Sequence, residues 1–301
     1  MTITYNDVVM DVSNVASLQG VDAQFTGSCN ITYLTARHVS RKDFDPLWRD
    51  IVTSADVVFH EEFAWSSEKK FALHAISQGD SRYLDVGMGS NESYSWQRLK
   101  SVAGTGIRQE FWDVSEREVS KLNLRSLIDR YHEAYMGAED AMRKGAFSEA
   151  LTSMHIAHSM LGEYDSHRDT IGVQCIIRRA NTLAEKASGN TVPRIVVFAG
   201  AAHIFQAVTI AKMFSREDLS VSVRSLIQNP FGHSIAAGYA SYLSGIVSEM
   251  AIVRSWLGAI LTGQVTAKNA GQPGAFAINE ADATVEQMSD EEACRLLRKL
   301  A

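Results

Sequence analysis

The 301-residue sequence is poor in the residues that mark specialised classes of protein. Three cysteines, Cys29, Cys175 and Cys294, are too few and odd in number for a disulfide scaffold. Four prolines exclude collagen-like and proline-rich chains, and no repeat period is visible. Because 46% of the residues are hydrophobic and the net charge is only −6, we expect a folded globule rather than a disordered chain.

Basic patches and long apolar runs are also scarce. Lysine and arginine number 29 against 35 acidic residues, so no positive field favours a nucleic acid. Residues 1–20 carry Asp7 and Asp11 and lack the basic start and apolar core of a secretory signal. The most apolar stretch, 234–262, contains Glu249 and Arg254, and its longest uncharged run is too short to span a bilayer. We therefore expect a cytoplasmic protein with neither nucleic-acid nor membrane partners.

Short β-rich runs alternate with helical patterns on both sides of a helical middle. Strands are predicted at 30–34, 56–61, 82–87, 107–113, 194–199 and 219–226, and helices at about 43–53, 66–78 and 204–213. Strands that alternate with helices are typical of βαβ units. The fold class is therefore predicted as α/β, with a mostly parallel central sheet and flanking helices.

The remaining segments are predicted to be mainly helical. Residues 115–189 have almost no strand signal and no proline, so we expect a helical insertion at about 115–190 with three or four helices. Residues 234–262 predict one or two helices rich in small residues, which pack within the chain or form the seam of a homo-oligomer. A polar linker is expected at about 264–283, and Ser289 with Glu292 predicts a capping box on a final helix. We interpret 1–301 as a single domain with a helical C-terminal region at about 234–301.

Histidines and carboxylates follow several of the predicted strands. His38 follows the first strand, Glu61 and Glu62 the second, Asp85 lies near the end of the third, and His203 follows the run at 194–199. Ligands of open parallel sheets bind outside the carboxyl ends of the strands. Two histidines and a glutamate suffice for a catalytic metal site, and the same groups could form a metal-free acid/base pair. Each is also compatible with a capping or solvated role.

The order of these motifs resembles the TraB/Tiki/GumN superfamily, to which ChaN-like haem-uptake proteins and, more distantly, erythromycin esterases are related. Residues 195–203 (IVVFAGAAH) resemble the second family motif, and 30–38 (NITYLTARH) the first. Residues 55–62 (ADVVFHEE) resemble the segment with the family glutamate, which matches Glu61. Residues 167–186 resemble an arginine-containing helix, with Arg168 as the arginine. The resemblance covers about 30–215, and Thr35 stands where the first motif has glycine.

This resemblance implies a hydrolase that acts on an ester or amide bond of a small molecule or peptide. In its metal-dependent form, His38, Glu61 and His203 would hold a divalent ion (Mn, Co or Zn), and Glu62 or Asp85 would accept a proton from the bound water. Arg168 would stabilise the oxyanion or hold a substrate carboxylate. In its metal-free form, His38 would act as general base, oriented by Glu61.

Three alternatives remain open. One is a ChaN-like module that binds haem or metal without turnover. Another is a metal-free His/Glu enzyme of biosynthesis or resistance, which opens a lactone or cyclises its substrate. The third is a relative that has lost catalysis, as Thr35 suggests. A separate pair, His155 and His158, has the i, i+3 spacing that places both rings on one helix face, where a structural role is the ordinary interpretation.

Overall fold

The chain forms two compact units. The computed structural model describes residues 1–37, 41–85, 94–188, 191–213, 219–231, 234–245, 247–269 and 272–300. Unit 1 comprises Met1–Glu118 and Arg168–Leu226, and unit 2 comprises Val119–His167 and Ile227–Ala301. No helix in these described ranges has the length and apolar character needed to cross a membrane.

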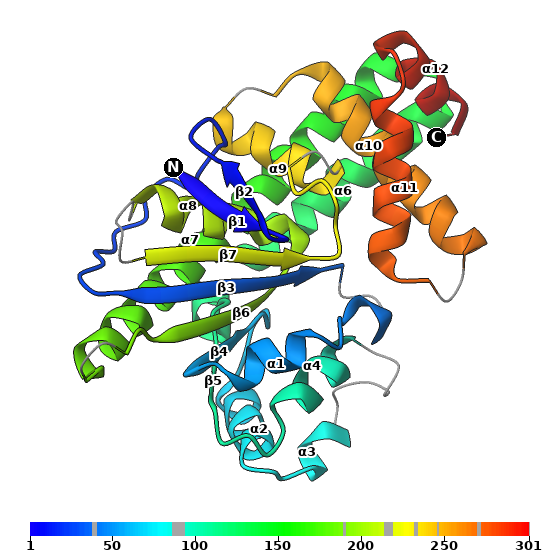
Figure 1. Ribbon diagram of the computed structural model, residues 1–301. Coiled ribbons are helices and arrows are strands. Elements are labelled where there is room, and N and C mark those ends of the chain that lie inside the picture. The colour runs from blue at the N-terminus through cyan, green and yellow to red at the C-terminus, as the bar shows by residue number, and fades with distance from the viewer. Residues whose placement is uncertain are drawn as a thin grey trace. The chain divides into compact units, whose positions relative to one another are not determined.

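Unit 1 is built on a seven-stranded sheet (Figure 1). Its strands are β1 (Thr2–Tyr5), β2 (Val8–Asp11), β3 (Cys29–Ala36), β4 (Val57–His60), β5 (Arg108–Phe111), β6 (Arg194–Gly200) and β7 (Leu219–Ser225). The spatial order is β2-β1-β7-β3-β6-β4-β5, and every pair is parallel except β1 with β2. The predicted α/β class and mostly parallel sheet are therefore confirmed.

One predicted strand, at 82–87, is wrong. Arg82–Asp85 forms the short helix α3, and residues 86–87 lie outside the described ranges. Asp80 initiates this turn, because its Oδ1 accepts the backbone N–H of Arg82 at 3.2 Å and its carboxylate pairs with the Arg82 guanidinium at 2.7 Å. A short apolar run does not distinguish a strand from one turn of helix, so local polar contacts decide the outcome here.

Both faces of the sheet are covered within unit 1. Helices α1 (Trp48–Thr53), α2 (Ser67–Ser77) and α4 (Tyr94–Val102) cover one face. They contribute a core shared with the strands, including Trp48, Val52, Leu73, Ile76, Leu99, Val102, Leu34, Val58, Val196 and Phe198. Helix α8 (Ile204–Met213) lies against the other face, where Gln206 accepts a hydrogen bond from Tyr33 of β3 at 3.3 Å.

In its described residues, 115–188, the predicted helical middle contains three helices: α5 (Glu116–Lys121), α6 (Leu124–Arg143) and α7 (Phe147–Lys186). Helix α7 continues through 40 residues, of which those from Arg168 onward belong to unit 1. There it passes close to the segment after β5. A Cβ on Gly172 would lie only 2.7 Å from Cε3 of Trp112, so glycine is what permits this approach.

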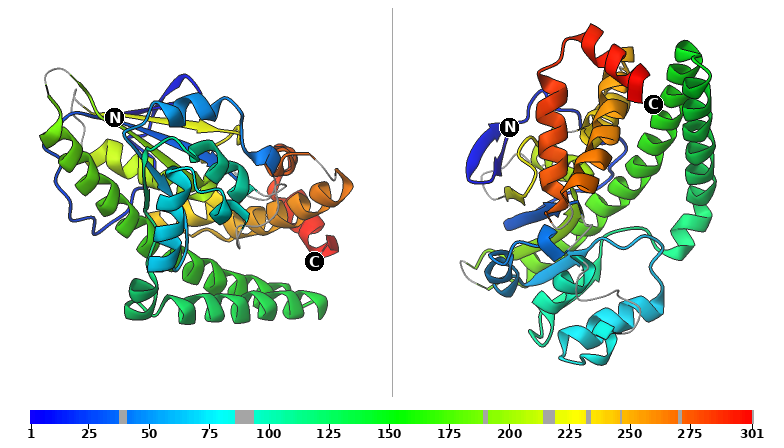
Figure 2. Two further views of the ribbon diagram at one scale, coloured as in Figure 1. Left: turned by 90° about the horizontal axis from the view of Figure 1, so that it is seen from below. Right: turned by 90° about the vertical axis from the view of Figure 1, so that its right-hand side faces the viewer.

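The regular secondary structure described in unit 2 is all helical. It contains the end of α5, all of α6, the first part of α7, α9 (Ser234–Ser244), α10 (Glu249–Lys268), α11 (Gly274–Glu286) and α12 (Asp290–Leu300). Helix α6 and the first part of α7 lie side by side in both views of Figure 2. They share a core with α10 and α12 that includes Ala138, Met142, Met154, Trp256 and Leu297.

The expected linker at 264–283 is wrong. Helix α10 continues to Lys268, and α11 begins at Gly274. The buried side of α11 includes Ala275, Ile278, Ala281 and Val285, which follow helical spacing but are mostly too small to give a strong apolar signal. The capping box is confirmed: Glu292 accepts the Ser289 backbone N–H at 2.9 Å, and the Glu292 N–H donates to the Ser289 hydroxyl at 3.3 Å.

The three cysteines are free thiols. Cys29 in β3 and Cys175 in the later part of α7 belong to unit 1, and Cys294 in α12 belongs to unit 2. Burial, with the Asp56 carboxylate, raises the pKa of Cys29 to about 12. Burial, with a smaller effect of Glu110, raises the pKa of Cys175 to about 11. Both unit 1 thiols are therefore un-ionised at neutral pH.

Candidate functional site

The connections of the sheet reverse direction between β3 and β6. After β3 the chain proceeds toward β4 on one side, whereas after β6 it proceeds to β7 on the other. Such a reversal opens a crevice at the carboxyl ends of the two strands, which is where open α/β sheets bind ligands. His203 lies just after β6, in the single turn η2 (Ala201–His203), and Glu61 follows the neighbouring strand β4.

His203 is held on both of its ring nitrogens. Nδ1 lies 2.6 Å from Oδ1 of Asp169 on α7, and Nε2 lies 3.3 Å from Oε1 of Glu61. The ring meets Trp112 edge-on, with centroids 5.1 Å apart. Asp169 is fixed in turn by the Gln206 amide, which donates to the same oxygen at 2.6 Å. The imidazole therefore has a single orientation, set by α7, α8 and the segment after β5.

Two carboxylates decide the charge of His203. Burial, the largest single influence, lowers the pKa of the imidazole, but Asp169 and Glu61 together outweigh it through charge and hydrogen bonding. The net result is a pKa well above 6.5. This direction favours the protonated ring, in which each nitrogen can donate a hydrogen bond to the carboxylate that it faces.

Glu61 is more exposed to solvent than the two cations that contact it: 17% of its side chain is exposed, against 5% for His203 and 9% for Arg168. Its Oε1 accepts from Arg168 at 3.2 Å as well as from His203. Its Oε2 accepts the backbone N–H of Gly200 at 2.5 Å, so the end of β6 positions this carboxylate directly. Its own backbone carbonyl accepts from Arg98 of α4 at 3.1 Å.

Arg168 connects Glu61 to a second buried acid. Its Nε and one terminal nitrogen form a bidentate pair with Asp113, at 3.0 and 2.6 Å. The guanidinium also lies over the Phe63 ring, 5.6 Å from its centroid. The Asp113 side chain is fully buried and accepts the Val114 backbone N–H at 2.7 Å. We name these five residues, Asp113, Arg168, Glu61, His203 and Asp169, the Glu61 cluster; its three carboxylates and two cations leave one net negative charge.

The structure brings together three of the sequence-predicted site residues: Glu61, Arg168 and His203. Glu62 instead forms an ion pair with Lys69 of α2. His38 lies outside the described residues, as does the side chain of Asp85 in α3.

Sequence reasoning missed Asp113, Asp169 and Gln206. Asp113 directly follows Phe111 and Trp112 at the end of β5, so the strand-end criterion that selected Glu61 applies equally to it. Asp169 and Gln206 lie on helices, and nothing in their local pattern indicates that they meet His203. Asp169 and Gln206 meet His203 only because α7 and α8 pack onto the sheet.

The described part of the cluster does not fit a metal ion as arranged. A metal ligand must offer a free lone pair, and a histidine ligand must be neutral. Here both nitrogens of His203 already face carboxylates, and Glu61 already has the Arg168 guanidinium, the His203 ring and the Gly200 N–H as partners. No group of three or more potential metal ligands is found in the described residues. Since His38 lies outside them, the predicted His38–Glu61–His203 site stays a prediction.

Comparisons of the chain with protein-family models, with curated proteins and with solved structures found no match. The resemblance to the TraB/Tiki/GumN superfamily therefore stays a prediction based on the motifs at 30–38, 55–62 and 195–203.

Proposed function

We propose that the Glu61 cluster is the active site of a hydrolase that cleaves an ester or amide bond of a small molecule or peptide. The observation that carries this proposal is the direct contact between a partly exposed carboxylate, Glu61, and a buried histidine, His203, at the carboxyl ends of parallel strands. Hydrolysis needs a base that takes a proton from water and an acid that gives a proton to the leaving group. This pair holds both functions in one contact.

Glu61 and His203 together accept and supply the protons that hydrolysis transfers. Glu61 accepts a proton from the attacking water, whose oxygen bonds to the acyl carbon. His203 donates the Nε2 proton to the leaving oxygen or nitrogen as the acyl bond breaks. The proton on Glu61 then returns to Nε2 across the 3.3 Å contact, which restores the starting state. Asp169 stabilises the imidazolium before the donation and after the return of the proton, since its carboxylate lies 2.6 Å from Nδ1.

Arg168 has the second role in this proposal. Its guanidinium contacts Glu61 at 3.2 Å and is anchored from behind by Asp113. A guanidinium held in this way stabilises a developing oxyanion, or binds a substrate carboxylate, without reorganising. Because Asp113 takes two of its N–H groups, the side chain stays in place when substrate approaches.

Neighbouring glutamates provide the matched control. The assay is hydrolysis of a panel of p-nitrophenyl esters and aminoacyl anilides by the wild type, Glu61→Gln, His203→Gln and Glu62→Gln. Glu62→Gln makes the same change in charge one residue away, at a side chain paired with Lys69. We expect Glu61→Gln and His203→Gln to lower kcat about 10²- to 10⁴-fold and Glu62→Gln to leave it within a few fold.

Metal analysis of the purified protein is run in parallel, with the assay repeated after chelation and after addition of Mn, Co or Zn. Activity that survives chelation supports the metal-free proton transfer described above. Activity that requires a metal contradicts the metal-free proton transfer and supports the metal-dependent hydrolase, in which His38, Glu61 and His203 would hold the ion. A wild type without hydrolysis on any substrate, with or without metal, refutes the hydrolase proposal, and a Soret band on haem titration would then favour the binding module.

A further inference from the structure

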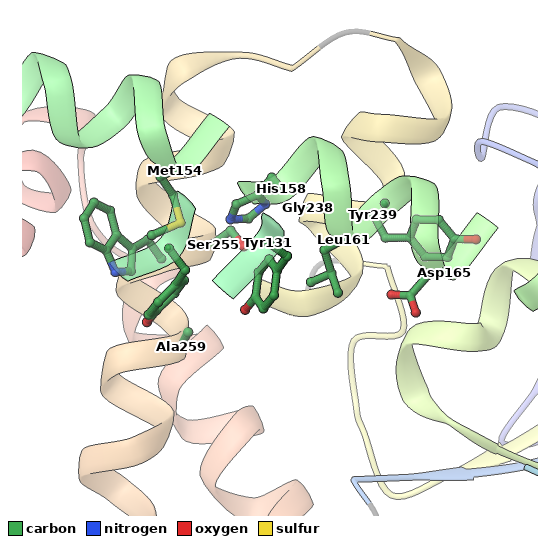
Figure 3. A pocket seen from close by; sticks show the side chains of 12 residues that line it. Tyr131, Met154, His158, Leu161, Asp165, Gly238, Tyr239, Ser255 and Ala259 are labelled. Carbon is green, nitrogen blue, oxygen red and sulfur yellow. The ribbon is translucent and has the colours of Figure 1, made fainter. Parts of the chain in front are cut away.

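A cavity lies within unit 2 and shares no residue with the Glu61 cluster. Its volume is about 120 Å³, and its walls come from α6, the first part of α7, α9 and α10 (Figure 3). An apolar cavity of about this size accommodates a group the size of benzene. The proposed hydrolase mechanism uses none of the residues that line it.

Four of the twelve described lining residues are tyrosine or tryptophan. Tyr131 and Tyr135 come from successive turns of α6, with ring centroids 6.0 Å apart, and Tyr239 and Trp256 come from α9 and α10. Trp256 and Tyr239 are buried, so packing fixes their positions. Figure 3 shows side chains from α6, α7 and α10 gathered round the cavity, with Asp165 and Tyr239 at one end. The π-faces of tyrosine and tryptophan carry negative potential, which attracts cations.

The charged group at the cavity is negative. Asp165 lines it, and no lysine or arginine is present among the described lining residues. The Asp165 carboxylate is close enough to Tyr131 to contribute, after burial, to raising the pKa of that phenol. The electrostatic potential of the cavity therefore favours a cation over an anion.

His158 supplies an uncharged polar group. Burial, with a smaller effect of His155, lowers the pKa of His158 to about 4, so the ring carries no charge at neutral pH. The imidazole lies against the backbone of α9, because a Cβ on Gly238 would come within 2.6 Å of its Nδ1. Ser255 faces the same spot, with its Oγ 3.3 Å from that Cβ position. Neither His158 nitrogen has a hydrogen bond to a described residue, which leaves the ring able to bind a ligand hydroxyl.

We propose that this cavity binds a small organic cation, an amine or quaternary ammonium ion that sits among the aromatic rings near Asp165 and directs a short polar arm to His158. The rings and the carboxylate recognise the charge, and the cavity volume limits the size. This site is separate from the proposed hydrolase site, and neither inference depends on the other.

Matched probes separate charge from shape. Choline and 3,3-dimethylbutan-1-ol have the same outline, but a carbon atom replaces the cationic nitrogen in the alcohol. Isothermal titration of the full-length chain with each probe is expected to give choline at least a tenfold lower Kd than the alcohol, which corresponds to about 1.4 kcal/mol. Equal affinities, or no binding of choline up to about 10 mM, would overturn the proposal.

Variants locate the binding in the cavity. Asp165→Asn is expected to weaken choline at least tenfold and to leave the alcohol unchanged. Ala259→Leu adds a bulky group at an exposed position of the lining and is expected to block both probes without disturbing the core. Asp140→Asn is the control, since that surface carboxylate on α6 pairs with Lys144, the residue after the helix, and does not line the cavity.

Circular dichroism and thermal melting establish that each variant is folded. If Asp165→Asn unfolds, Ala259→Leu decides the location by itself. Unchanged choline affinity in Ala259→Leu places the binding elsewhere and refutes the assignment. Unchanged affinity in a folded Asp165→Asn refutes the role of the carboxylate.

Discussion

The bidentate pair between Asp113 and Arg168 gives a quantitative prediction for unit 1. Asp113 is fully buried and Arg168 is 9% exposed, so solvent screens their attraction weakly. Removing one partner of a buried pair costs about 3–5 kcal/mol, because the other charge stays behind without compensation. The perturbations are Asp113→Asn, Arg168→Met and the double variant.

The contacts place each variant within that range. Asp113→Asn keeps one acceptor oxygen, and Arg168 still pairs with Glu61 at 3.2 Å, so we expect a loss of about 3 kcal/mol. Arg168→Met removes the guanidinium from two carboxylates at once, so about 4 kcal/mol is expected. The double variant removes both charges of the pair. Its loss of unfolding free energy should therefore be smaller than the sum of the two single-variant losses by about 2 kcal/mol or more.

Urea unfolding, followed by tryptophan fluorescence, measures these differences. Four of the five tryptophans, Trp48, Trp65, Trp96 and Trp112, belong to unit 1, so the signal reports mainly on the unit that contains the pair. Single variants that lose less than about 1 kcal/mol would refute the reasoning, since that is the range of an exposed ion pair. Strict additivity in the double variant would refute the coupling.

Two further predictions concern His203 and Gly172. Asp169 and Glu61 hold the pKa of folded His203 well above its unfolded value of about 6.5, so the stabilisation of the fold by the protonated ring is complete below pH 6.5 and is lost as the pH rises through the folded pKa. The difference in free energy of unfolding between wild type and His203→Gln should therefore shrink from pH 7 upward in urea titrations. A difference that grows with pH would contradict this sign. Gly172→Ala should destabilise the protein by about 1–2 kcal/mol in thermal melts, because the new Cβ would lie 2.7 Å from Trp112. Gly137→Ala on α6 is the control: the atom nearest to its new Cβ is 3.9 Å away, so this variant should stabilise by up to about 1 kcal/mol.

The sheet could be predicted where burial leaves a strong sequence pattern. Strand β6 is buried on both faces and appears as the continuous apolar run at 195–199. The hairpin of β1 and β2 was not predicted although its signal is present. Asn6 and Asp7 have φ of 44° and 69°, and both residue types tolerate the left-handed region that a two-residue hairpin turn requires. Short segments such as α3 were mispredicted because their structure depends on local hydrogen bonds rather than on periodicity.

The site was predictable only in part, for a similar reason. Glu61 and His203 follow strands, so sheet topology alone brings them to one edge. Asp169 reaches His203 only because α7 packs against the sheet with one particular face inward. A close contact between Gly172 and Trp112, which are 60 residues apart in the chain, accompanies that orientation, and no local pattern encodes it.

The placement of the three cysteines has a practical consequence. Native Cys29 and Cys175 resist thiol reagents because burial keeps them un-ionised, and they react only when unit 1 opens. Cys294 is half-buried beside Met250 in the other unit, with the two sulfur atoms 3.8 Å apart. Pulsed alkylation followed by mass spectrometry can therefore time the opening of each unit on one unmodified chain, without an engineered probe.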